Sequence, residues 1–71
     1  MTRKERDFLF KAVHDLRTPL QAIMGYSSLV LRKIGDQIPE QQRENLERVV
    51  LSADRLKSMI DQMVVHLRAK N

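Results

Sequence analysis

The fold is decided by residues 9–34, LFKAVHDLRTPLQAIMGYSSLVLRKI, in which apolar side chains recur at alternating spacings of four and three. The positions on this spacing are Leu9, Val13, Leu16, Leu20, Ile23, Ser27, Val30 and Ile34. A second segment repeats the pattern at Leu46, Val49, Ala53, Leu56, Ile60, Met63 and Leu67. This alternation is typical of the seam of a supercoiled helical bundle, so it predicts two long α-helices.

A short break separates the two periodic segments. Gly35 is expected to end the first helix in a left-handed conformation, and Pro39 suits the first turn of the next helix. The prediction is an all-α antiparallel hairpin that forms one domain over residues 1–71. Its first helix covers about residues 3–34, its loop 35–38 and its second helix about 39–70. His66, Arg68 and Lys70 place positive charge at the end of the second helix, where the helix dipole favours it.

The apolar face of the first helix is wider than a two-helix hairpin can cover. Beside the seam lie further apolar side chains, with Phe10, Met24 and Leu31 on one flank and Ala12 and Tyr26 on the other. Ordering a chain of this length costs on the order of 100 kcal/mol of conformational entropy, which a small core barely offsets. We therefore expect two hairpins to pair into a homodimeric four-helix bundle.

The composition excludes several kinds of site. The chain has no cysteine, which rules out disulfides, thiolate zinc sites and cysteine nucleophiles. Its two histidines lie far apart in sequence, and its two glycines cannot build a phosphate-binding loop. We therefore expect this chain to bind no metal, nucleotide or cofactor. No apolar run approaches the roughly 20 residues of a membrane span, so we expect no membrane contact by this chain.

A net charge of +4 raises the question of nucleic acid. Residues 1–11 hold four basic and two acidic side chains, and residues 54–71 hold the same numbers. Because both signs are mixed at both ends, we expect no nucleic-acid partner. A basic nucleic-acid binder remains an alternative, which would show an affinity that falls steeply with salt.

One stretch does not suit a helix built only for packing. Pro19 interrupts the first helix at a cost of about 3 kcal/mol and predicts a local kink. His14 lies one position past the seam residue Val13, toward solvent, and Thr18 follows one turn later on the same face. Arg17 is within reach at i+3. An exposed imidazole, a carboxylate, a guanidinium and a hydroxyl are therefore expected to gather beside the kink.

These residues resemble a known motif. The run His14-Asp15-Leu16-Arg17-Thr18-Pro19-Leu20, with Phe8 six residues before the histidine, resembles the H-box of sensor histidine kinases in two-component signalling. The resemblance covers the whole chain and implies their dimerisation and histidine phosphotransfer domain, a helical hairpin that dimerises into a four-helix bundle. One departure is that the family's commonest residue after the histidine is glutamate, whereas here it is Asp15.

The resemblance also implies roles for these side chains. His14 would be the phosphoacceptor that attacks the γ-phosphoryl of ATP, and Asp15 would fix its tautomer and take up the proton. Arg17 would help to organise charge around the phosphate, and Thr18 would orient a water for dephosphorylation of the partner. Pro19 would set the kink that lets the histidine adjust between states. A neutral imidazole is a suitable nucleophile near pH 7.

The implied partners are a second copy of the chain, the ATP-binding catalytic domain of the same kinase and the receiver domain of a response regulator. ATP and Mg²⁺ would be bound by that catalytic domain, so this chain alone is expected to be inactive. The expected location is the cytoplasm, with membrane anchoring of the full-length protein left open. The main alternative is a non-catalytic coiled-coil dimerisation module in which His14 is incidental. His66 has no motif around it and is read as a helix-dipole partner.

Overall fold

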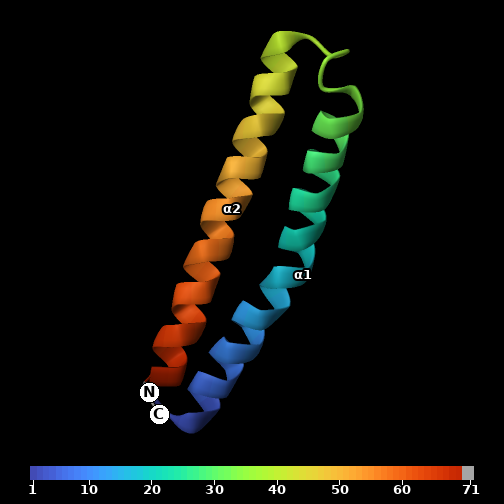
Figure 1. Ribbon diagram of the computed structural model, residues 1–71. Coiled ribbons are helices and arrows are strands. Elements are labelled where there is room, and N and C mark those ends of the chain that lie inside the picture. The colour runs from blue at the N-terminus through green and yellow to red at the C-terminus, as the bar shows by residue number, and fades with distance from the viewer. Residues whose placement is uncertain (70–71) are drawn as a thin grey trace.

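The computed structural model describes residues 1–69 and contains two α-helices packed antiparallel (Figure 1). α1 spans Arg3–Ile34 and α2 spans Glu40–Ala69, so the predicted helical hairpin is confirmed. The start of α1 and the end of α2 lie at the same end of a rod whose Cα extents are 52 × 15 × 13 Å. Lys70, the predicted last residue of the second helix, lies outside the described residues.

Thr2 caps the start of α1. Its hydroxyl oxygen accepts a hydrogen bond from the backbone N–H of Glu5 at 3.1 Å, and the hydroxyl donates to Glu5 Oε1 at 3.0 Å. The backbone of Thr2 is extended, with φ −73° and ψ 162°, as N-cap residues commonly are. A threonine three residues before a glutamate is the spacing of a capping box, a signal of a helix start that the apolar pattern does not contain.

The end of α1 differs from the expectation at Gly35. This residue is right-handed, with φ −58° and ψ −31°, and its N–H donates to the Leu31 carbonyl at 3.0 Å. The prediction of a left-handed cap was therefore wrong. Glycine is required here by close approach instead, because a Cβ at this position would overlap the Leu31 carbonyl oxygen. After the turn, the Pro39 carbonyl accepts from the N–H groups of Gln42 and Arg43, which starts α2.

The two helices meet along an inner face that uses only half of the predicted seam. Its core consists of Val13, Leu20, Ala53, Ile60 and Val64, with Phe10 and Met24 packed against it. Phe10 and Met24, expected on a flank, thus belong to the contact between the helices. Ile60, only 1% exposed, is the largest fully buried side chain of this core.

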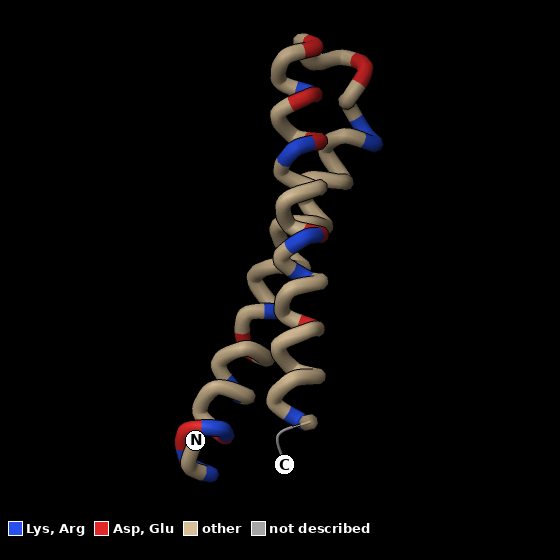
Figure 2. Tube along the Cα trace, turned by 90° about the vertical axis from the view of Figure 1, so that its left-hand side faces the viewer, with Lys and Arg blue, Asp and Glu red and all other residues tan. Residues whose placement is uncertain are grey.

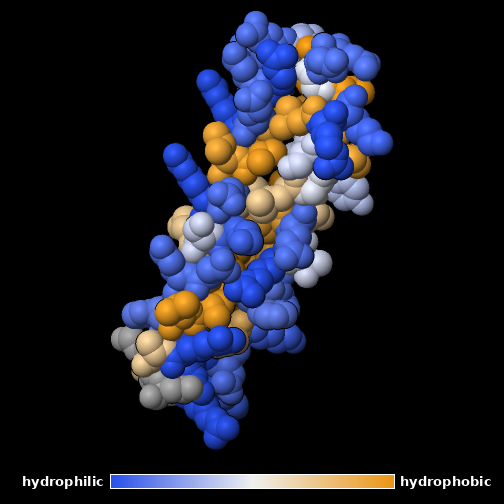
Figure 3. All heavy atoms as spheres, in the orientation of Figure 1, coloured by the Kyte–Doolittle hydropathy of each residue, from blue (hydrophilic) through white to orange (hydrophobic). Residues whose placement is uncertain are grey.

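The other half of the predicted seam stays exposed, and we call it the outer strip. It consists of Leu9, Leu16, Ile23 and Val30 on α1 and Val49, Leu56 and Met63 on α2, each seven residues from the next. One partner helix covers only one face, so a second apolar face is left over. The accessible surface of 5848 Å² exceeds by roughly 1,300 Å² the 4,600 Å² or so expected for a monomer of this mass. Figure 3 shows hydrophobic patches along the length of the hairpin, with hydrophilic side chains between and around them.

Charged residues of both signs are distributed along both helices (Figure 2). Neither helix, over the residues that the structure describes, has an apolar stretch long enough to cross a membrane.

Candidate functional site

α1 presents His14 to solvent directly after the buried Val13. Successive helical residues are turned by about 100°, which puts His14 about 40° from Thr18 and about 60° from Arg17 around the helix. His14 and Thr18 are both exposed, and the buried Val13 and Leu20 fix this part of α1 against α2. The imidazole and the hydroxyl therefore share one solvent-exposed face of α1, and the opposite face of α1 packs against α2.

Asp15 and Pro19 lie outside this face. Asp15 is exposed and turned by about 100° from His14, and no side-chain hydrogen bond or ion pair of Asp15 is present within residues 1–69. The structure therefore does not hold this carboxylate against the imidazole. α1 continues as one helix through Pro19 and changes direction in its middle part (Figures 1 and 2).

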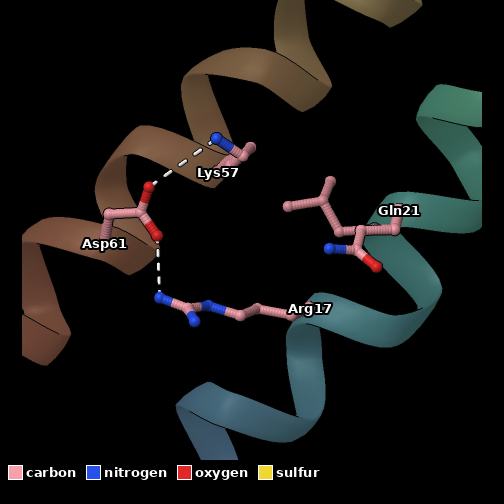
Figure 4. Close-up of a pocket in the computed structure, with 5 residues that line it drawn as sticks. Arg17, Gln21, Lys57 and Asp61 are labelled. Atoms are coloured by element: carbon pink, nitrogen blue, oxygen red, sulfur yellow. Dashed lines mark hydrogen bonds and ion pairs between the residues drawn. The ribbon is translucent and has the colours of Figure 1, made fainter.

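Arg17 joins α1 to α2. Its Nη2 donates to Asp61 Oδ1 at 2.8 Å, and Lys57 Nζ lies 3.8 Å from Asp61 Oδ2 (Figure 4). The resemblance implied for Arg17 a role in organising charge around the phosphate. The structure places it in a salt bridge between the helices, one helical turn from His14.

This ion pair forms a charged layer in an otherwise apolar contact. On α1 the inner positions are Phe10, Val13, Arg17, Leu20 and Met24, and on α2 they are Ala53, Lys57, Ile60, Val64 and Leu67. The layer lines a half-open pocket of about 270 Å³ together with Leu20 and Gln21 (Figure 4).

Lys57 and Asp61 were not among the site residues expected from the sequence. Lys57 directly follows the seam residue Leu56, and Asp61 lies one turn after Lys57 on the same flank of the helix. That signal shows a polar layer in α2, but the α1 residue that meets it depends on how the helices are aligned.

His66 lies near the end of α2, exposed and five residues after Asp61 of the charged layer. Its neighbour Arg68, expected only as a partner of the helix dipole, also stacks over the Phe10 ring, with its Cζ 5.6 Å from the ring centroid. Within residues 1–69 there is no group of three or more His, Asp and Glu side chains placed to hold a metal ion.

Comparisons with known proteins agree on one family. Residues 4–65 match the family model of the His Kinase A (phospho-acceptor) domain. The chain is 38% identical over 63 residues to the probable sensor histidine kinase TcrY of Mycobacterium tuberculosis, a match that covers 89% of this chain and 13% of that protein. It is 39% identical over 62 residues to the sensor protein DivL of Caulobacter vibrioides, covering 87% of this chain and 8% of DivL.

A third relative is the hybrid signal transduction protein dokA of Dictyostelium discoideum, 35% identical over 63 residues, or 89% of this chain and 4% of dokA. The chain thus spans only a small part of each of these relatives. No solved structure shows a significant match to the chain.

Proposed function

Because this chain belongs to the His Kinase A (phospho-acceptor) domain family, we propose that it is the dimerisation and phosphotransfer domain of a sensor histidine kinase. His14 accepts the γ-phosphoryl of ATP and passes it to an aspartate on the receiver domain of a response regulator. ATP and Mg²⁺ are bound by a separate catalytic domain of the same kinase. The observation that supports this most directly is the position of His14, exposed on a helix face with Thr18 beside it and apolar anchors behind it.

The first transfer needs a nucleophile that an ATP-bearing domain can approach in line. The unprotonated ring nitrogen of His14 attacks the γ-phosphorus, a P–N bond forms, and the bond from that phosphorus to the β–γ bridging oxygen breaks as ADP leaves. The proton on the other ring nitrogen passes to Asp15. The absence of any competing side-chain partner of Asp15 within residues 1–69 supports this role, since the carboxylate is free to turn toward the imidazole.

The second transfer and the later hydrolysis of its product use the same open face. The receiver's aspartate attacks the phosphorus, the P–N bond breaks, and an acyl phosphate forms on the regulator. We propose that the hydroxyl of Thr18 then orients a water that hydrolyses this acyl phosphate. Its place about 40° from His14 and one turn along α1 supports this role, because a regulator docked over the imidazole brings its aspartate to the same spot.

A second copy of the chain covers the outer strip in this proposal. An apolar groove of about 360 Å³ runs along the strip, lined by Leu20, Ile23, Arg48, Val49, Ser52, Ala53 and Leu56. The surplus surface of roughly 1,300 Å² is the size of one partner's share in an obligate dimer interface. A non-catalytic dimerisation module would use the same strip, so the strip supports dimerisation without separating the two functions.

A phosphorylation assay with labelled ATP distinguishes the phosphotransfer domain from the non-catalytic dimerisation module. The chain is incubated with the catalytic domain of its kinase and γ-labelled ATP, and the product is tested for phosphate that is labile in acid and stable in alkali. The parent and His66→Gln should both become labelled, whereas His14→Gln should not. Circular dichroism and native mass should be unchanged in His14→Gln, because the side chain is exposed and its loss opens no cavity. A labelled His14→Gln variant would refute the site, and an unlabelled parent would favour the non-catalytic module.

A further inference from the structure

The charged layer is the one polar interruption of the inner face beside the phosphoacceptor. Arg17 is the only charged residue among the inner positions of α1 from Phe10 to Met24, and Lys57 occupies such a position on α2. The side chains of Arg17 and Asp61 are 37% and 48% exposed. An ion pair this open to water is weakly held, because the gain from charge attraction is screened. The layer can therefore rearrange without disturbing the apolar core on either side.

Arg17 has two possible acceptors within the length of its side chain. One is the Asp61 carboxylate, now 2.8 Å away. The other is a group bound covalently to the imidazole ring of His14, which lies three residues before Arg17 on the same helix. A phosphoryl group there would bring close to two negative charges and three acceptor oxygens, for which a planar guanidinium is well shaped.

Asp61 can release Arg17 at little cost. Its second oxygen already lies 3.8 Å from Lys57 Nζ, on the same helix at i,i+4. Removing one partner of a pair is costly mainly when it leaves a charge without compensation. Here the carboxylate keeps a cation beside it after Arg17 has left, and the half-open pocket of about 270 Å³ leaves the guanidinium room to turn.

We propose that Arg17 exchanges partners when His14 is phosphorylated. Its guanidinium then separates from the Asp61 carboxylate and binds the phosphoryl group. Asp61 is then a positioning residue that holds Arg17 one turn from the imidazole until the phosphate arrives. The exchange removes a link between α1 and α2 at the level of His14, so phosphorylation of one helix changes its contact with the other. The biological use of this exchange rests on the proposed function, whereas the exchange itself depends only on a phosphorylated His14.

Chemical phosphorylation tests the exchange without any kinase. Phosphoramidate transfers its phosphoryl group to an imidazole nitrogen, forming a P–N bond to the ring as ammonia leaves. The chain is used with His66→Gln, so that His14 is the only histidine that can react. Unfolding equilibrium constants are measured by chemical denaturation for the parent, Arg17→Gln, Asp61→Asn and the double variant, before and after phosphorylation at one protein concentration.

The ion pair Arg43–Glu47 is the matched control, with a distance of 3.8 Å, comparable exposure and a position near the loop, far from His14. Before phosphorylation, the double-mutant cycle should show coupling between Arg17 and Asp61 of about two- to fivefold in the equilibrium constant. After phosphorylation this coupling should fall to about onefold, while that of Arg43 with Glu47 stays as it was. As a second readout that needs no unfolding, the ³¹P resonance of the phosphohistidine should move in Arg17→Gln and stay in place in Arg43→Gln.

The exchange would be overturned if the coupling between Arg17 and Asp61 is the same before and after phosphorylation. It would also be overturned if the ³¹P resonance does not shift in Arg17→Gln. A chain that takes phosphate from phosphoramidate but never from ATP and the catalytic domain would refute the proposed function and leave this test intact.

Discussion

Leu56→Ala tests whether a second copy covers the outer strip, and Leu51→Ala is its matched control. Both leucines lie on α2, and both are exposed in the single hairpin, at 45% and 64%. Only Leu56 lies on the strip, seven residues from both Val49 and Met63. A single hairpin therefore predicts that both substitutions change the stability only slightly and by similar amounts. A four-helix bundle predicts that Leu56→Ala destabilises far more than Leu51→Ala.

The size of the difference follows from the burial. Full burial of a leucine side chain contributes about 1.5–3 kcal/mol. A dimer would bury the part of Leu56 that the hairpin leaves exposed, which corresponds to about 0.7–1.3 kcal/mol per copy. Two copies change in each dimer, so the lost burial alone should raise the dimer dissociation constant of Leu56→Ala by at least about 10- to 100-fold. The cavity left in the bundle brings the total loss of stability to about 2–5 kcal/mol per site, whereas Leu51→Ala should leave the dissociation constant unchanged.

Sedimentation equilibrium over a wide concentration range gives the dissociation constants. Thermal unfolding gives an independent check, because the midpoint of a dimer that folds as it associates rises with protein concentration. Equal dissociation constants for Leu56→Ala and Leu51→Ala would refute the reasoning. So would a parent chain with monomer mass and a midpoint that stays flat over a hundredfold dilution.

Three further substitutions test separate parts of the structure. Thr18→Ala in the full-length kinase should keep autophosphorylation but slow dephosphorylation of a pre-phosphorylated regulator about a hundredfold, and a rate within twofold of the parent would contradict the role of its hydroxyl. Thr2→Ala should lower the free energy of unfolding by about 1 kcal/mol in chemical denaturation, because Glu5 loses its cap, while Thr2→Ser should retain it. Gly35→Ala should also lower the free energy of unfolding, because the alanine Cβ would overlap the Leu31 carbonyl oxygen. Alanine is otherwise more stable than glycine by about 1 kcal/mol in right-handed helical backbone, so a variant more stable than the parent would contradict the overlap.

Local features of the chain were largely predictable. The apolar spacing and the break at Gly35 and Pro39 predict two long helices joined by a short loop, and the structure has α1 over Arg3–Ile34 and α2 over Glu40–Ala69. The exposure of His14 next to the buried Val13 also follows from spacing alone, because a residue one step from an apolar seam turns away from it. The conformation of Gly35 was not predictable in this way, since glycine suits either a left-handed cap or a close approach and only the surrounding backbone selects one.

The sequence by itself determined that the chain is a helical hairpin with more apolar surface than two helices can bury, and that one exposed histidine stands in a specific motif. Only the tertiary structure decided which half of the seam residues on each helix packs against the other helix. Leu9 and Phe10, or Ile23 and Met24, are equally apolar neighbours about 100° apart around the helix, so the apolar pattern alone does not decide which of the two faces the other helix. The rotation of each helix is set by both helices packing together, and the same packing decides that Arg17 meets Asp61, 44 residues away. A pairing between side chains so distant along the chain leaves no trace in the spacing of either helix.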